Sequence, residues 1–413
     1  MVFEPPEPGA AATRLLPDRG RRRNRINALV LTAALAGIAL GGWVLKGEYD
    51  AWRDRGLIDK ACAGLADPRT VMRLDGGVDA VGLDGGRPGR SAQAVGIAHI
   101  CVLDTPRERD GEERDEEYFS LTVRELPHRY PFHLIGDGDR PFAHRGREEG
   151  EDVTARTDLP SRHPLGDGTL GDYGRQTVTV TARCENSSVL VSAAAGFEKV
   201  SGADRQLLAR IARQGALRAA ARRGCEPALP GLPERMPEAT ADLGPAGAGQ
   251  GTCAWYAEFL RGADRGRLPD RSVGAPVAAH TGGESCTLAV SPAETKRIFE
   301  GLTEQERAGA PELSRVLDRS PWWIRTQTYF GDEAQGTYVG SLADRFSVTE
   351  RKAGRQGGVL YGSADCQGRP AAFTLNVDAE YQHLLEPSLT ELFKAYATDA
   401  AARRGCTGLT LPG

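Results

Sequence analysis

Two stretches of the chain share one order of apolar and polar positions. From Thr177 to Cys184 valine and threonine alternate, a polar turn follows, and Ser188 to Ala195 is apolar. Alternation with period two predicts one strand, and the apolar run after the turn predicts its partner. After Ser201, apolar residues recur at helical spacing, namely Leu208, Ile211, Gly215 and Ala219, flanked by Leu207 and Ala212. The pattern therefore predicts a strand, a second strand and a helix.

The second stretch repeats this order closer to the C-terminus. Val359 to Cys366 predicts a strand, Gln367-Gly368-Arg369 a turn, and the segment through Val377 a second strand. A helix is expected next, because apolar residues recur at helical spacing at Leu385, Leu389, Leu392, Tyr396 and Ala400. Ser388 and Glu391 have the spacing of a capping box. Each helix ends with two arginines and a glycine, Gly224 or Gly405, which predicts a left-handed residue after the last turn.

A repeated heptapeptide and the cysteines indicate that these stretches close two sequence repeats. Ala-Ala-Ala-Arg-Arg-Gly-Cys occurs at residues 219–225 and again at 400–406. The intervals are 39, 83 and 41 residues among Cys62, Cys101, Cys184 and Cys225, and 33, 80 and 40 among Cys253, Cys286, Cys366 and Cys406. None of these eight cysteines lies within four residues of another, which excludes short-loop zinc knuckles and favours structural disulfides.

Strand and helix lengths predict how the cysteines pair. A strand of about eight residues extends ~28 Å from the turn, and a helix of about 20 residues retraces ~30 Å. The end of the helix therefore returns beside the turn, which predicts the pairs Cys184–Cys225 and Cys366–Cys406. Cys62–Cys101 and Cys253–Cys286 follow by remainder from the three connectivities that four cysteines allow in each repeat.

The second cysteine of each repeat predicts a strand that leads toward a helix start. Ser291, Pro292 and Glu294 have the N-cap, N1 and N3 identities of a strong helix start. The first repeat diverges here, because Glu108 to Glu117 is acidic and lacks an apolar face, which favours a solvated loop. Between the repeats, prolines and glycines at 227–250 predict a semi-extended linker.

An uncharged, mostly apolar segment precedes the repeats. Ile26 to Leu45 would cover the ~30 Å hydrocarbon core of a bilayer at ~1.5 Å per residue, which predicts a transmembrane helix. An arginine cluster at residues 21–25 lies directly before it, so the positive-inside rule predicts a cytoplasmic N-terminus and an extracytoplasmic remainder. A cleavable signal peptide, with Ala34-Leu35-Ala36 as its processing site, is the alternative.

The expected fold class is α+β, with two tandem homologous domains that each hold an antiparallel sheet, packed helices and two disulfides. The boundaries are a disordered cytoplasmic tail at 1–25, a transmembrane helix at 26–45, a juxtamembrane segment at 46–57, repeat 1 at 58–226, the linker at 227–250 and repeat 2 at 251–409. Residues 1–25 carry a net charge of +3, so the rest of the chain, whose total is −4, holds −7. An acidic domain pair is a poor candidate for binding nucleic acid.

Few residues of the sequence are candidates for catalysis, cofactor binding or ligand binding. Gly166 to Gly171 matches a dinucleotide fingerprint but precedes a strand instead of a helix, so a loop is favoured. Trp322 and Trp323 could stack on a ligand, although core packing is the commoner use. A metal site is conceivable in an acidic stretch with four histidines, but the spacings fit no short-loop ligand pair and a surface loop is favoured. These residues are His128, His133, His144 and His163, with Asp137, Asp139, Glu148, Glu149 and Asp152.

No residue is assigned a catalytic, cofactor-binding or metal-ligating role, and no cofactor is expected. The basic N-terminus, the single apolar segment, the linker and the two four-cysteine domains resemble uncharacterised membrane-anchored envelope proteins of Streptomyces-type actinobacteria. The cysteine-containing helix starts and the closing strand–helix–cysteine units are similar, more faintly, to two-disulfide extracytoplasmic sensor and lipoprotein domains of the same bacteria. That second similarity implies ligand binding rather than catalysis, although the chain departs from sensor kinases in having no kinase domain.

Three functions remain as expectations. A non-enzymatic envelope module that binds a partner, glycan or lipid predicts an apolar and aromatic pocket. An envelope hydrolase predicts two carboxyl groups that converge in a cleft with perturbed pKa values. A structural or assembly factor predicts a broad exposed apolar patch. No nucleophile elbow, Ser-x-x-Lys or His-Glu-x-x-His motif occurs, which favours the binding module, whereas convergence of the four histidines on a carboxylate would argue against it.

Overall fold

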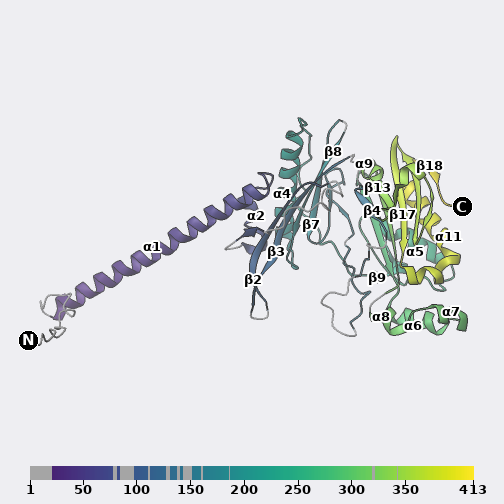
Figure 1. Cartoon of the computed structure of the whole chain (residues 1–413), viewed down its shortest axis with the longest axis horizontal. Coiled ribbons are helices and arrows are strands. Elements are labelled where there is room, and N and C mark those ends of the chain that lie inside the picture. The colour runs from purple at the N-terminus through teal and green to yellow at the C-terminus, as the bar shows by residue number, and fades with distance from the viewer. Residues whose placement is uncertain are drawn as a thin grey trace, which may run out of the picture. The chain divides into compact units, whose positions relative to one another are not determined.

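A computed structural model describes residues 21–77, 81–83, 97–109, 112–126, 131–136, 140–142, 151–159, 161–185, 187–318, 321–341 and 343–413 (Figure 1). Within these ranges, the side chains of residues 21–26, 37–47, 83, 107–109, 112–115 and 309 are not described. The chain divides into two compact units, Met1–Gly56 and Leu57–Gly413. Both sequence repeats therefore belong to one compact unit.

Helix α1 (Arg21–Ala61) is the long purple helix of Figure 1 and contains the apolar segment from Ile26 to Leu45. Four of its large apolar side chains are 58–70 % exposed, namely Leu29, Val30, Leu31 and Leu35. Among the described residues, no helix meets the length and hydropathy that a membrane crossing requires. The last turn of α1 belongs to the second unit, where Ile58 and Cys62, which directly follows the helix, are fully buried in the core of repeat 1.

Repeat 1 contains a seven-stranded antiparallel sheet. Helix α4 (Gly202–Ala221) packs on β7 and β8 through the predicted apolar face, which includes Leu208 and Ile211. Two short helices, α2 (Pro68–Val71) and η1 (Leu74–Gly76), precede the sheet. In spatial order the strands are β1 (Gly82–Leu83), β2 (Ile97–Arg109), β3 (Glu112–Leu126), β8 (Ser188–Ala195), β7 (Thr177–Arg183), β6 (Gly171–Tyr173) and β5 (His163–Pro164).

Repeat 2 has the same central strand order in an eight-stranded sheet. Strands β11, β12, β17 and β16 lie side by side, as β2, β3, β8 and β7 do in repeat 1. The sheet consists of β15 (Gly354–Gln356), β16 (Val359–Cys366), β17 (Arg369–Val377), β12 (Trp323–Phe330), β11 (Gly283–Ala289), β10 (Arg271–Gly274) and β9 (Gly244–Pro245), with β18 (Cys406–Thr410) beside β16. Helix α11 (Ala379–Arg403) packs on it, so the duplication seen in the sequence is repeated in the topology.

Shorter helices complete repeat 2. They are η2 (Ala246–Ala248), η3 (Gly251–Cys253), α5 (Ala254–Gly262), α6 (Pro292–Glu300), α7 (Glu304–Gly309), α8 (Leu313–Asp318), α9 (Asp332–Gln335) and α10 (Val348–Arg351). As predicted, α6 begins after Ser291, whose hydroxyl accepts a hydrogen bond from the Glu294 amide. Ser201 caps α4 in the same way within a capping box. Gly224 and Gly405 adopt φ values of 72° and 60°, which confirms the left-handed helix ends.

All four predicted disulfides are present. Cys184 pairs with Cys225 and Cys366 with Cys406, so each bond joins a hairpin turn to the end of the following helix. The other two bonds, Cys62–Cys101 and Cys253–Cys286, join a helix or helical turn to the strands β2 and β11. No described cysteine is free. The two pairs predicted from strand and helix lengths and the two that follow by remainder are therefore confirmed.

Two local predictions are wrong. Helix α11 begins at Ala379, not near Ser388, because Asp378 caps it by accepting hydrogen bonds from the amides of Glu380 and Tyr381. The added first turns bury Tyr381 and Leu384 in the core, and the helix continues through Pro387 even though an internal proline costs about 3 kcal/mol.

The prediction of a solvated loop from Glu108 to Glu117 is the second one that is wrong. Outside residues 110 and 111, it belongs to the hairpin of β2 and β3, where Arg107 pairs with Arg114 and Glu108 with Glu113. Main-chain hydrogen bonds form such a ribbon without an apolar side-chain pattern, so the lack of an apolar face did not exclude a strand.

The segment between the repeats packs against both of them. Met236 and Ala239 are buried in the core of repeat 1, and β9 pairs with β10 of repeat 2. A strand from repeat 1 also enters repeat 2: β4 (His133–Ile135) runs parallel to β13 (Thr337–Gly340), which in turn pairs with β14 (Arg345–Ser347). Figure 1 shows β4 beside β13. The repeats are therefore joined by main-chain pairing.

The glycine-rich loop of the supposed dinucleotide fingerprint lies at this junction. It connects β5 to β6, and no helix follows it. Gly168 has φ +88°, and a Cβ atom built on it would lie 2.6 Å from the amide nitrogen of Thr281 in repeat 2. Gly166 also has a positive φ of +68°, but nothing lies within 4 Å of a Cβ atom there. Gly168 is therefore needed for the close approach of the repeats as well as for the turn.

Replacing these two glycines separates the effect of backbone conformation from that of packing. We expect Gly166→Ala to lower the free energy of unfolding by about 1 kcal/mol, since only the left-handed conformation is strained. Gly168→Ala should cost about 2 kcal/mol more, because its Cβ atom also meets repeat 2. Urea unfolding monitored by circular dichroism measures both changes. Equal losses in the two variants would contradict the close packing at Gly168.

Candidate functional site

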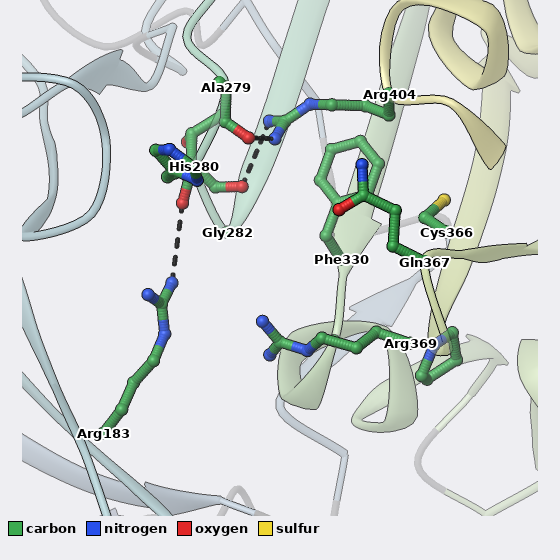
Figure 2. Close-up of a pocket in the computed structure, with 12 residues that line it drawn as sticks. Arg183, Ala279, His280, Gly282, Phe330, Cys366, Gln367, Arg369 and Arg404 are labelled. Carbon is green, nitrogen blue, oxygen red and sulfur yellow. Dashed lines mark hydrogen bonds between the residues drawn. The ribbon is translucent and has the colours of Figure 1, made fainter.

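A pocket of about 160 Å³ lies where the turn of the β16–β17 hairpin, the end of α11 and the edge of repeat 1 meet (Figure 2). Its charged side chains are Arg183 from repeat 1 and Arg369 and Arg404 from repeat 2, with His280 beside them. None of the described residues that line it is an aspartate or a glutamate. We call this site the cationic pocket.

The hairpin turn positions two of the lining residues. Gln367 and Gly368 have φ values of 61° and 79°, the left-handed pair that a two-residue type I′ turn requires. The turn directs β17 to begin at Arg369, and Gly331, with φ +60°, lies directly against the guanidinium group of that residue. The neighbouring Cys366–Cys406 disulfide ties this turn to the residues that follow α11. One covalent bond thus holds both repeat 2 elements that supply arginines.

Arg404 forms one wall of the cationic pocket. Its guanidinium carbon lies 4.1 Å from the centre of the Phe330 ring, a cation–π contact. It donates hydrogen bonds to the carbonyl oxygens of Ala279 and Thr281 and to the Glu284 carboxylate, 3.1 Å from Oε1. Since only 9 % of its side chain is exposed, Arg404 is a fixed positive charge.

Arg183 and Arg369 extend toward each other from opposite repeats, as Figure 2 shows. Arg183 makes a long hydrogen bond of 3.5 Å to the His280 carbonyl oxygen. Burial, and then the positive charge of Arg369, lower the pKa of the Arg183 guanidinium group. Arg369 has a distant partner, since its Nη2 atom is 3.9 Å from the carboxylate of Asp332. Both groups are guanidinium cations, so the space between them attracts anions.

Repeat 1 neutralises the equivalent helix end with a carboxylate. Strand register aligns Cys101 with Cys286 and their partners Leu121 and Thr326, which places Glu125 at the position of Phe330. In repeat 1 the carboxylate of Glu125 pairs with Arg223, the counterpart of Arg404. In repeat 2 the ring of Phe330 takes this position, and the carboxylate that pairs with Arg404 is Glu284 of β11, which does not line the cationic pocket. The two repeats therefore differ in what contacts the second arginine at this helix end.

A buried ionic cluster joins the repeats near the pocket. The Arg162 guanidinium binds the Asp172 carboxylate at 2.5 Å, and it binds Glu333 of repeat 2 at 2.6 and 2.9 Å. His133 Nε2 lies 2.9 Å from Glu333 Oε2. Next to this cluster, Ser188 donates a hydrogen bond to the Asp332 carboxylate across the same junction. Glu333 of repeat 2 thus binds two residues of repeat 1, Arg162 and His133.

The environment of this cluster sets its protonation. Burial opposes ionisation of Glu333, but the charge of Arg162 and the hydrogen bond to His133 hold its pKa well below the usual range. Burial raises the pKa of Asp172, against the effect of Arg162. Burial also lowers the pKa of His133 to about 4, so its imidazole is neutral at pH 7. The cluster is one cation shared by two carboxylates.

The structure separates the histidines that the sequence grouped together. His133 lies in β4 against Glu333, whereas His163 lies in β5 beside Tyr173 and is only 6 % exposed. The surface-loop interpretation is wrong for these two side chains, because β4 and β5 are covered by the rest of the unit. His128 and His144 lie outside the described residues, as do Asp137, Asp139, Glu148 and Glu149. Among the residues that are described, no His, Cys, Asp and Glu group is arranged to hold a metal ion.

The two tryptophans offered as binding aromatics are core residues. Trp322 is fully buried and stacks on Tyr381 at 5.3 Å between ring centroids. Trp323 is 6 % exposed and packs with Phe142 and Ala289. Neither ring presents a surface to a ligand. This arrangement favours the core-packing alternative.

The sequence contained partial signals for the cationic pocket. Arg404 lies in the repeated heptapeptide and Arg369 in the predicted turn, but sequence reasoning gave the arginines a role only at the helix ends. No local signal marked Arg183, because it belongs to the other repeat. Comparison of the chain with protein-family models, curated proteins and solved structures finds no match. Chemically, the cationic pocket offers charge-assisted hydrogen bonds to an anionic group.

The low pKa of His133 predicts how stability changes with pH. Between its unfolded pKa near 6.5 and the folded value of about 4, the unfolded chain binds a proton that the folded one does not. His133 should therefore contribute stability above pH 6.5 and lose about 2–3 kcal/mol of it as the pH falls to 4. Urea unfolding at several pH values should show a shallower pH dependence for His133→Gln than for the unchanged chain. The exposed His280→Gln is the control, and equal slopes in all three proteins would contradict the assignment.

Proposed function

We propose that the protein is a non-enzymatic binding module of the cell envelope, and that its cationic pocket binds an anionic group of a ligand or partner. The observation that carries this proposal is that three arginines, and no carboxylate among the described residues, line the pocket. About 160 Å³ is room for one phosphate or carboxylate group, not for a whole large ligand. The rest of such a ligand would extend over the exposed side of Arg369, whose side chain is 52 % exposed.

Geometry supports specific recognition rather than general attraction of anions. Arg404 is already held by carbonyl oxygens and by Phe330, so its side chain loses little conformational entropy when an anion binds. Arg183 and Arg369 approach the same space from two repeats, and an anion between them would relieve their mutual repulsion. Guanidinium groups also match the planar geometry of carboxylate and phosphate oxygens.

The alternative functions have weaker support. A hydrolase requires two available carboxyl groups, but Asp172 and Glu333, which do converge, are both bound to Arg162. An assembly factor requires a broad apolar patch. Among the described residues of Leu57–Gly413, Val277 is the one large apolar side chain that is strongly exposed. The other strongly exposed ones all lie on α1.

A membrane location is part of the proposal. The apolar residues from Ile26 to Leu45 follow an arginine cluster, and Leu29 to Leu31 are exposed on α1. We propose that this segment anchors the protein in the cell membrane with its N-terminus in the cytoplasm. Four disulfides fit an oxidising compartment, which supports an extracytoplasmic location of the repeats.

Anion binding can be measured on the full chain in detergent. We expect inorganic phosphate or acetate to bind, as measured by calorimetry, and Arg369→Gln or Arg183→Gln to weaken binding about tenfold or more, since a charge-assisted hydrogen bond contributes about 1.5–3 kcal/mol. The two anions distinguish phosphate from carboxylate recognition.

Arg261→Gln provides the matched control, because Arg261 is 73 % exposed on α5 and does not line the pocket. This variant should bind as the unchanged chain does. Failure of both anions to bind, or equal binding by all three arginine variants, would refute the proposed function.

Membrane attachment can be tested by fractionation. The full chain should remain in the membrane pellet after an alkaline carbonate wash, and deletion of residues 26–45 should release it, because the apolar segment supplies the attachment. Mass spectrometry of the N-terminus is the companion measurement. A mature chain that begins after Ala36 would instead establish a cleaved signal peptide.

A further inference from the structure

A second cavity, of about 280 Å³, lies between the sheet of repeat 2 and the segment of repeat 1 that contains β4. The sheet side is formed by β11 and β12 through Ser285, Arg325, Gln327 and Tyr329. The opposite side is formed by residues 132–135. We call it the polar cavity. It shares no lining residue with the cationic pocket.

The sheet face that lines the polar cavity is unusual because it is both buried and polar. Arg325, Gln327 and Tyr329 alternate along β12 and are only 8 %, 6 % and 3 % exposed. The intervening residues face α11, as the hydrogen bond between Thr328 and Tyr396 demonstrates. A buried sheet face that only had to pack would be apolar, as in the rest of the core. Polar groups at these positions suggest that they bind something.

Gln327 has an unused hydrogen-bonding atom. Its Nε2 atom donates to the Tyr329 hydroxyl at 2.7 Å, but its Oε1 atom is buried and accepts no hydrogen bond from the described residues. A buried acceptor is normally satisfied by protein or by a bound molecule. A ligand that donates a hydrogen bond to Oε1 would supply the missing partner.

The charged groups around the polar cavity already have partners. Arg162 is bound to Asp172 and Glu333, and Glu284 is bound to Arg403 and Arg404. Arg325 also interacts within the protein. A charged ligand would have to displace these contacts, whereas a neutral one need not. The lining therefore favours an uncharged polar molecule.

The lining of the polar cavity combines polar and apolar residues. Leu134, Ile135 and Phe132 contribute carbon surface, while Ser285 and Tyr329 contribute hydroxyl groups. His133 and Arg162 retain 19 % and 21 % side-chain exposure, so solvent reaches the edge of the cavity. A polyhydroxylated molecule combines hydroxyl groups that donate and accept with C–H surface, and it matches this lining. We propose that the polar cavity binds a small neutral polyol, such as a monosaccharide unit.

The test uses the full chain in a detergent without a sugar head group. Glucose, N-acetylglucosamine and myo-inositol serve as probes, with saturation-transfer NMR to detect binding and calorimetry to measure it. We expect at least one probe to bind. Gln327→Leu, which removes the acceptor at similar volume, should weaken that binding at least tenfold, and Ser285→Ala should weaken it several-fold.

Arg369→Gln is the matched control, since it removes a group of the cationic pocket only and should leave polyol binding unchanged. If Gln327→Leu does not fold, as judged by circular dichroism, Ser285→Ala decides the outcome. Absence of binding by all three probes would mean that the cavity holds only water and would overturn the proposal. Unchanged binding in the folded variants would also overturn it. A loss of phosphate binding would contradict the proposed anion site but would not change the expected polyol binding. The two proposals can therefore be refuted independently.

Discussion

The contact between Arg162 and two carboxylates, one from each repeat, is the interaction on which the arrangement of the repeats depends. Asp172 holds the guanidinium group within repeat 1, and Glu333 binds it from repeat 2. A buried ion pair adds little net stability, but loss of one partner leaves a buried charge and costs several kcal/mol. Any arrangement of the repeats that separates Arg162 from Glu333 is therefore strongly disfavoured. Main-chain pairing of β4 with β13 reinforces the same geometry.

Both proposed sites are consequences of this junction. The cationic pocket requires Arg183 of repeat 1 to approach Arg369, and the polar cavity requires residues 132–135 to cover the sheet of repeat 2. Glu284 connects the two sites, since it lines the polar cavity and binds Arg404 of the cationic pocket. Neither repeat forms either site alone, which gives a physical reason for two repeats in one compact unit.

The two repeats share the order of four central strands but differ in the side chains that their strands carry. Each repeat ties a hairpin turn to a helix end with a disulfide, which places two arginines beside the turn. One equivalent position differs, because Glu125 pairs with Arg223 in repeat 1, whereas Phe330 makes a cation–π contact with Arg404, whose carboxylate partner is Glu284 on another strand. The disulfides therefore hold the same strand–helix unit in both repeats, while the side chains on the strands differ.

The sequence by itself determined the elements whose causes are local. Periodicity predicted β7, β8, β16, β17 and α4. Strand and helix lengths then predicted the pairs Cys184–Cys225 and Cys366–Cys406, because the rise per residue of a strand or a helix does not depend on what surrounds it. Capping of α11 at Asp378 was missed, since burial of Tyr381 in the core outweighed the capping-box signal of Ser388 and Glu391. Only the tertiary structure brought His133, Arg162 and Glu333 together. Contacts between residues 171 or 200 positions apart depend on burial and charge pairing across the fold, and no local pattern encodes them.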